Sequence, residues 1–107
     1  PVTTPEMTPG EVTPRPLQLP GIGALFLVGD DALSRQWLKA NAAALRERQA
    51  VGMVVSVADE NSLKTLRELA PGVMMVPSSG SALARRLQLN HWPVLITDSG
   101  ISGVVTP

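Results

Sequence analysis

The strongest constraint on the fold is a run of apolar residues without a polar break, Ala24-Leu25-Phe26-Leu27-Val28. A strand with one face in water alternates apolar and polar residues, whereas a continuous apolar run is typical of a strand covered on both faces. Similar runs follow at 52–57, 73–76 and 94–97. These four segments predict a sheet with further structure packed on both of its sides.

The first gap between these runs predicts a long helix from Ala32 to about Gln49. Either Asp30 or Asp31 can cap its start, because a short carboxylate accepts hydrogen bonds from the first free N–H groups and suits the positive end of the helix dipole. Apolar residues recur at helical spacing, and we expect them to face the sheet. They are Leu33, Trp37, Ala40 and Ala44.

Two shorter helices are predicted farther along the chain. One begins after a cap at Asp59, Asn61 or Ser62 and ends at Pro71-Gly72. The other covers 82–89, with Leu83 and Leu87 inward and Arg85 and Arg86 in solvent. After the strand at 94–97, the turn sequence Asp98-Ser99-Gly100 allows 101–105 to return as an antiparallel edge strand. The predicted order is βαβαβαββ.

Residues 1–20 have a different composition and hold six of the ten prolines. Proline at this density prevents helix formation and interrupts strand pairing, so we expect an extended tail or linker preceding an α/β domain at 21–107. The alternative is a tail that drapes over the domain, with Met7, Val12 and Leu17 as its apolar anchors.

Composition excludes several classes of function. Nine basic residues balance nine acidic ones, so we expect no direct nucleic-acid binding, and Arg85 and Arg86 are interpreted as a solvated helix face. The chain has no cysteine, which removes disulfide exchange, thiolate nucleophiles and cysteine metal sites. No cofactor is expected. No apolar run approaches the roughly 20 residues that span a bilayer.

The fourth strand is entered through a Trp-Pro bond in Leu89-Asn90-His91-Trp92-Pro93. Proline fixes its own φ, lacks an N–H and suits the first residue of a strand. An X-Pro bond can be cis at modest cost, and we predict a cis bond between Trp92 and Pro93. Most X-Pro bonds are trans, and the cis prediction depends on the fold that this context, a proline-led strand followed by a hairpin, resembles.

That context resembles the second half of a thioredoxin-like fold, a central mixed sheet of 4–5 strands flanked by about three helices. In such folds a cis-proline loop lies beside the N-terminus of the helix after the central strand, where redox members carry Cys-x-x-Cys. The corresponding residues here are Gly29-Asp30-Asp31-Ala32-Leu33-Ser34, with neither thiol.

Longer stretches of the sequence resemble particular protein families, beyond the likeness to the thioredoxin-like fold in general. The segments 73–77 and 82–97 resemble the strand, helix and x-Pro-strand region of TrbC-type conjugative pilus-assembly proteins. Together with 27–38 and the Thr/Pro-rich 1–16, the chain is similar to a family of integrating conjugative element proteins. The resemblance implies an exported, periplasmic protein of a Gram-negative bacterium that works with other proteins of a type IV secretion-like DNA-transfer apparatus. It implies no catalytic residue.

The candidate site combines the two regions that this fold brings together. We expect Asp30, Asp31, His91, Trp92 and Pro93 to converge on one edge of the sheet. Redox relatives hold an extended peptide there by adding it as a strand beside the proline. The hypothesis is a non-catalytic protein-binding groove with an exposed Trp92 as an apolar anchor. The alternative for that residue is a place in the core, and for His91 a solvated loop.

Two other functions remain open from the sequence. The pair Asp30-Asp31 after an apolar strand also resembles the magnesium-binding acids of receiver domains, with Asp59 and Thr97 in the neighbouring roles. That site needs a lysine on a later strand, and none follows Lys64. The third possibility is a purely structural subunit without a groove, whose partner contacts lie on the tail or the outer helix faces.

Overall fold

The apolar run at 24–28 lies in strand β3 (Ala24–Gly29), and this strand is internal to the sheet as predicted. In the computed structural model, which describes residues 1–105, β3 pairs in parallel with β4 (Val51–Ser56) and antiparallel with β7 (Val94–Thr97). Within these residues the main sheet has six strands in the order β2-β8-β7-β3-β4-β5. The remaining members are β2 (Arg15–Pro16), β5 (Met74–Pro77) and β8 (Gly100–Ser102).

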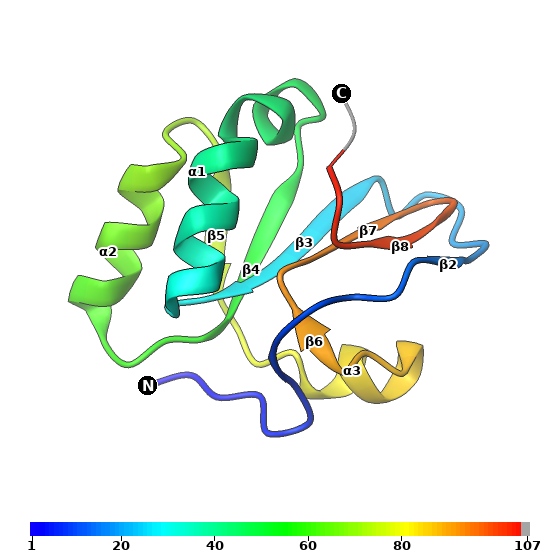
Figure 1. Ribbon diagram of the computed structural model, residues 1–107, viewed down its shortest axis with the longest axis horizontal. Helices are drawn as coiled ribbons and strands as arrows, with labels where there is room; N and C mark the ends of the chain where they lie inside the picture. Colours follow the sequence, from blue (N-terminus) through cyan, green and yellow to red (C-terminus); the bar gives the residue numbers. More distant parts are fainter. Residues whose placement is uncertain (106–107) are drawn as a thin grey trace.

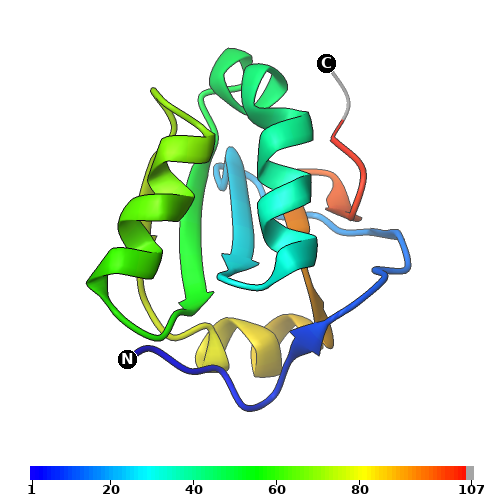
Figure 2. The ribbon, with the colours of Figure 1, turned by 60° about the vertical axis from the view of Figure 1, so that its left-hand side comes forward.

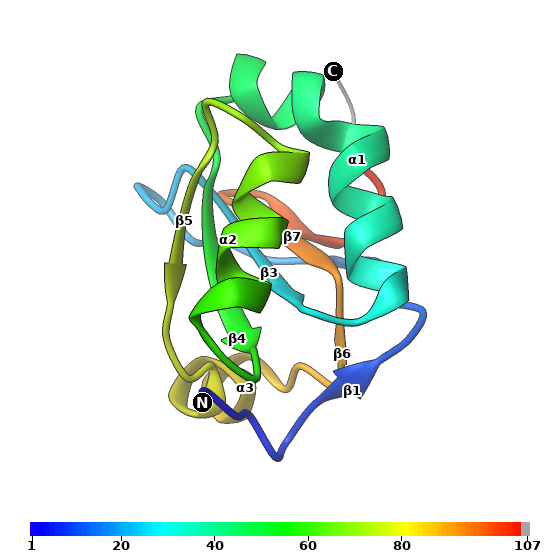
Figure 3. The same ribbon diagram turned by 90° about the vertical axis from the view of Figure 1, so that its left-hand side faces the viewer.

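Helices lie on both sides of this mixed sheet, which makes the described chain a compact α/β fold. Helices α1 (Ala32–Glu47) and α2 (Glu60–Leu69) cover one face, and the shorter α3 (Ser81–Leu87) lies on the other side (Figures 1 and 3). Alternate residues of β3 serve the two cores: Phe26 and Val28 pack with α1 and α2, and Leu27 packs with the α3 side. Coverage of both faces explains the unbroken apolar run.

The predicted apolar face of α1 is right only in part: Trp37 and Ala44 are half-buried, with Trp37 packed against the core, but Leu33 and Ala40 are exposed. The buried residues are Ser34, Leu38, Ala42 and Leu45, whereas Leu33 is 44% exposed. The reason is a polar residue that belongs to the buried stripe: the Ser34 hydroxyl accepts a hydrogen bond from Gly29 N–H and donates one to Asp31. A pattern built on apolar residues alone cannot identify this serine as part of the core.

The other helices are close to their predictions. The Asp59 carboxylate accepts the backbone N–H of Ser62 and caps α2, and these hydrogen bonds lower the pKa of Asp59. Leu63 and Leu66 are buried, and Arg85 and Arg86 are exposed on α3. No helix within residues 1–105 has both the length and the apolar character needed to cross a membrane.

The predicted last strand is shorter than 101–105 and does not lie at the edge of the sheet. It is β8, and it lies between β7 and β2. Arg15 pairs with Ile101, and Pro16 with Gly100, so the N-terminal segment supplies the edge. This added strand also explains why the sheet has six strands within the described residues rather than the predicted four or five.

Of the two arrangements considered for residues 1–20, the structure has the draped one. Met7 is buried at 3% exposure, and Val12 and Leu17 are half-buried against the same apolar cluster. The segment is extended, as its prolines predict, and contributes short β1 (Thr8–Pro9), which pairs in parallel with β6 (His91–Trp92). The last two residues of the domain predicted at 21–107 lie outside the described residues.

Candidate functional site

The site is built on the turn that joins β3 to α1. Asp31 is the N-cap of α1, with its Oδ2 accepting the backbone N–H of Ser34 at 3.0 Å. Its Oδ1 accepts the Ser34 hydroxyl at 2.9 Å, and the same hydroxyl oxygen accepts the N–H of Gly29 at 2.9 Å. A carboxylate with these partners at the positive end of a helix is held in a fixed orientation.

The proline loop meets this turn through Trp92. The indole N–H of Trp92 donates to Asp31 Oδ1 at 2.8 Å, and the Trp92–Pro93 bond is cis, as predicted. Gly29 permits the approach, because a Cβ there would lie 2.8 Å from both Asp31 Oδ1 and Trp92 Nε1. The structure therefore brings Asp31, Trp92 and Pro93 together. Trp92 is only 5% exposed, so the hypothesis of an exposed aromatic anchor is wrong and its indole belongs to the core.

The neighbouring acid, Asp30, faces another part of the molecule. Its Oδ2 accepts the backbone N–H of Ala58 at 2.9 Å, and it lines a small depression with Arg35 and Asp59. Thr97 pairs with Ala24, at the opposite end of β3 from Asp30, so it does not join Asp30 and Asp59 in a receiver-like site. Among the residues that the structure describes, no three His, Asp or Glu side chains lie close enough to hold a metal ion.

The backbone edge beside the cis bond is occupied by the chain's own N-terminus. Thr8 N–H donates to the carbonyl of Asn90 at 3.0 Å, and Gly10 N–H donates to the carbonyl of Trp92 at 3.0 Å. His91, the partner of Thr8 in the register, is half-buried, with Nδ1 3.2 Å from Thr8 Oγ1. Figures 2 and 3 show β1 beside β6 at the lower end of the sheet. We call residues 2–10 the strap.

Side chains of the strap dock along the sheet edge and α3. The Thr4 hydroxyl, 3% exposed, donates to Val55 O at 2.7 Å and accepts the N–H of Gly80 at 2.9 Å. Val2 forms a two-way backbone bridge with Val57. Glu6 accepts hydrogen bonds from the Ser81 hydroxyl at 2.6 Å and from Arg85 at 2.7 Å, and with its own backbone these donors lower its pKa.

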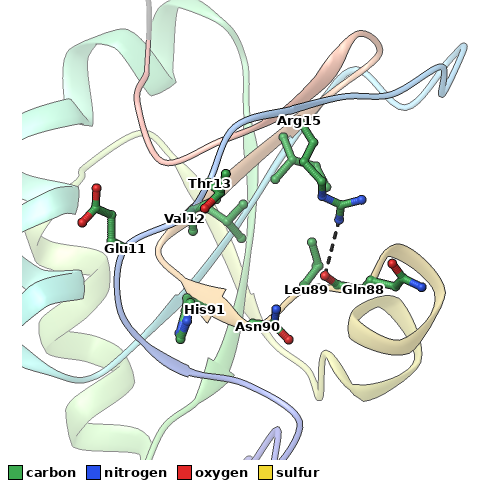
Figure 4. A pocket seen from close by; sticks show the side chains of 10 residues that line it. Glu11, Val12, Thr13, Arg15, Gln88, Leu89, Asn90 and His91 are labelled. Carbon is green, nitrogen blue, oxygen red and sulfur yellow. Dashed lines mark hydrogen bonds between the residues drawn. The ribbon is translucent and has the colours of Figure 1, made fainter.

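A cavity of about 390 Å³ lies beneath the chain that leaves the strap. One wall comes from residues 11–13 and Arg15 and the other from residues 88–91 (Figure 4). Val94 and Ile101 also line the cavity. Arg15 reaches across the opening and donates to the backbone carbonyls of Leu87 and Gln88. The guanidinium therefore fixes the distance between the two walls.

A family model described as "Protein of unknown function (DUF2859)" matches residues 1–101. The chain belongs to this family. The DUF2859 match begins at the first residue, so it covers the strap, the sheet and the cis-proline loop as one unit. No curated protein matches the chain, and no solved structure does.

Sequence reasoning missed most of the residues that complete this site in the DUF2859 chain. Within the strap, only Met7 indicated packing on the domain, because it is a long apolar side chain in a Thr/Pro-rich stretch. It was predicted as an anchor if the N-terminal tail drapes over the domain. Thr4 and Glu6 carry no local pattern, because their partners Val55 and Arg85 lie 51 and 79 residues away. Such pairings become visible only in the folded chain.

Proposed function

We propose that this protein is a non-catalytic, periplasmic protein-binding component of a conjugative, type IV secretion-like apparatus encoded by an integrating conjugative element. We further propose that its α/β fold is thioredoxin-like. The support is the resemblance of 27–38, 73–77 and 82–97 to conjugation proteins, together with the position of the cis-proline loop beside the start of α1. Its binding partners are then other proteins of that apparatus.

One observation carries the proposal of a peptide-binding edge. The carbonyl of Trp92, next to the cis bond, accepts a backbone hydrogen bond from an extended segment of the chain, at Gly10. Addition of an extended strand to an exposed backbone edge is a general mode of peptide recognition, in which main-chain hydrogen bonds give affinity and side-chain pockets give selectivity. The edge of β6 has the geometry for this mode.

The side chains at the start of α1 support a proposal without the redox chemistry of thioredoxin-like proteins. Disulfide exchange requires a thiolate, and the chain has no cysteine. Asp31 accepts hydrogen bonds from Ser34 and Trp92, and Asp30 from Ala58. Both carboxylates thus act as structural acceptors that orient the loop and the helix.

Site-specific photo-crosslinking in donor cells tests this function. A photoreactive amino acid replaces Asn90, which is exposed beside β6, and the matched control replaces Lys39, which is exposed on α1. Both proteins are expressed in a donor that lacks the chromosomal copy, where each must restore DNA transfer. We expect the Asn90 probe to form a crosslink to a protein of the transfer apparatus, identified by mass spectrometry, and the Lys39 probe not to form it.

The alternatives give different results in the same experiment. A purely structural subunit predicts that the Lys39 probe, or probes on other outer helix positions, captures the apparatus and that the Asn90 probe does not. Normal DNA transfer by a donor without this protein would contradict the proposed role in conjugation altogether.

A further inference from the structure

We infer that the strap is an intramolecular ligand of the β6 edge, and that the partner binds there by replacing it with an extended segment of the same chemical pattern. This inference rests on the proposed protein-binding function and specifies how that site is regulated. It depends on three properties of the strap: it fills a selective site, it can detach without disturbing the sheet, and its release exposes the backbone beside the cis bond.

The first property is selectivity. The Thr4 hydroxyl uses both its donor and its acceptor capacity, between Val55 O and Gly80 N–H, so this position requires a hydroxyl group. Met7, three residues later, is buried in the apolar cluster that contains Trp92. A polar side chain at position 7 would be buried without a partner there.

The next positions add charge and shape. Glu6 faces the guanidinium of Arg85 and the hydroxyl of Ser81 on α3. Pro9 needs no N–H, because Thr8 and Gly10 supply the two donors that reach β6. Glycine is required at position 10, where a Cβ would lie 2.9 Å from Nδ1 of the His91 ring. The site therefore selects an extended segment with hydroxyl, acid, long apolar and glycine residues at the spacing of 4, 6, 7 and 10.

The second property is that the strap is attached through a connection with a single apolar contact. Glu11, Thr13 and Pro14 are exposed beside the 390 Å³ cavity, and Val12 is half-buried against the apolar cluster that contains Met7. From Arg15 onward the chain is fixed again, by pairing of β2 with β8 and by the Arg15 hydrogen bonds to the end of α3. Rotation within residues 11–14 would release the strap and leave the six-stranded sheet intact.

Release has a defined consequence for the edge. The carbonyls of Asn90 and Trp92 lose their donors, and the apolar pocket around Met7 opens to solvent. An exposed strand edge next to an open apolar pocket is a template for pairing, so the opened edge favours a replacement strand. Because the strap is tethered, its effective concentration is on the order of millimolar. The apparent Kd of a competitor equals its intrinsic Kd divided by the fraction of time that the site is open.

Peptide binding to the full chain tests the inference. The probe is a fluorescent peptide with the sequence of residues 2–10, Val-Thr-Thr-Pro-Glu-Met-Thr-Pro-Gly, and its control carries Asp in place of the methionine. Three proteins are compared: wild type, the strap-weakening variant Glu6→Lys, and the variant Thr8→Cys/His91→Cys. The two cysteines occupy paired positions of β1 and β6 in a chain without other thiols, so their disulfide locks the strap.

We expect Glu6→Lys to bind the probe at least tenfold more tightly than wild type, and the oxidised double-cysteine protein to bind none. Reduction should restore binding, and the reduced double-cysteine protein is the reference for the oxidised one. The inference is overturned if the oxidised protein binds the peptide as tightly as the reduced one does, or if Glu6→Lys has the same affinity for the peptide as wild type. It is also overturned if the Asp-containing control peptide binds as tightly as the probe. Dimers formed by exchange of straps, in place of a one-to-one peptide complex, also contradict it.

The design separates this inference from the proposed function. Binding of the probe to the strap-weakened protein, together with normal conjugation in a donor that lacks the protein, would leave the strap mechanism standing and remove the role in DNA transfer. If the Asn90 probe crosslinks to the apparatus but the peptide never displaces the strap, the proposed function stands and the strap mechanism is excluded.

Discussion

The backbone N–H of Gly10 donates to the carbonyl of Trp92 at 3.0 Å, across 82 positions of the chain. This contact joins the Thr/Pro-rich N-terminus to the residue that precedes the cis-proline bond. It makes the strap part of the folded domain, and it places an extended segment at the edge where we propose that a partner binds. The predictions below test the strap, the loop beneath it and the sheet that supports both.

Burial of Met7 makes the strap a contributor to the stability of the whole domain. Met7 is 3% exposed in the α3-side core, so Met7→Ala should lower the free energy of unfolding by about 2–3 kcal/mol. Met74, which is 64% exposed, provides a matched control, and Met74→Ala should change the free energy of unfolding by less than about 0.5 kcal/mol. Urea unfolding measures both; equal effects would show that the strap is not packed in the core.

The contact between Trp92 and Asp31 predicts an energetic coupling between the proline loop and the start of α1. In a double-mutant cycle of Trp92→Phe and Asp31→Ala, we expect a coupling of about 1 kcal/mol or more, because the hydrogen bond has a charged acceptor and a largely buried donor. Chemical denaturation of the four proteins gives the value. Additive effects would mean that the two segments are not held together by this bond.

The sheet beneath the site is packed without room for an extra methyl group at Gly52. A Cβ there would lie 2.3 Å from the Phe26 ring, so Gly52→Ala should destabilise the fold by about 1–3 kcal/mol. At Gly103 a Cβ would meet its nearest atom at 3.6 Å, an ordinary contact, and Gly103→Ala should be close to neutral. Thermal unfolding of the pair compares them, and a neutral Gly52→Ala would contradict the packing of β3 on β4.

The attachment of the strap to α3 should weaken in acid. The Ser81 hydroxyl and Arg85 lower the pKa of Glu6, so the carboxylate stabilises the folded chain above its ordinary pKa of about 4.5. This contribution is lost as the pH falls through the lowered value. We expect wild type to exceed Glu6→Gln in stability at pH 7, and this advantage to disappear as the pH falls below the lowered pKa of Glu6. A difference that persists at low pH would exclude this role of Glu6.

The sequence predicted the sheet and helices well because their signals are local. The unbroken apolar run at 24–28 and the proline that leads β7 each indicate their structure within a few residues, and the cis bond at Trp92–Pro93 is confirmed. The errors arose where a polar residue belongs to the core. Ser34 is buried because Gly29 and Asp31 satisfy its hydroxyl, and this displaced the expected face of α1.

The candidate site was predicted in part, for a related reason. The convergence of Asp31 with Trp92 and Pro93 was expected from the resemblance of the loop and helix start to those of a thioredoxin-like fold. The separation of Asp30 from this group, and the occupation of the edge by Thr8 and Gly10, depend on contacts between distant parts of the chain. No pattern within the first 20 residues indicates where their backbone finds its partners.

The most direct test of the account is conjugation by donors that carry the Thr8→Cys/His91→Cys protein in place of wild type. Each single-cysteine variant serves as its control, and formation of the disulfide is verified by gel mobility with and without reductant. We predict that the locked strap lowers transfer frequency at least tenfold relative to either single-cysteine variant. Wild-type transfer by a donor whose protein is fully locked would contradict the central claim that a partner replaces the strap at the β6 edge.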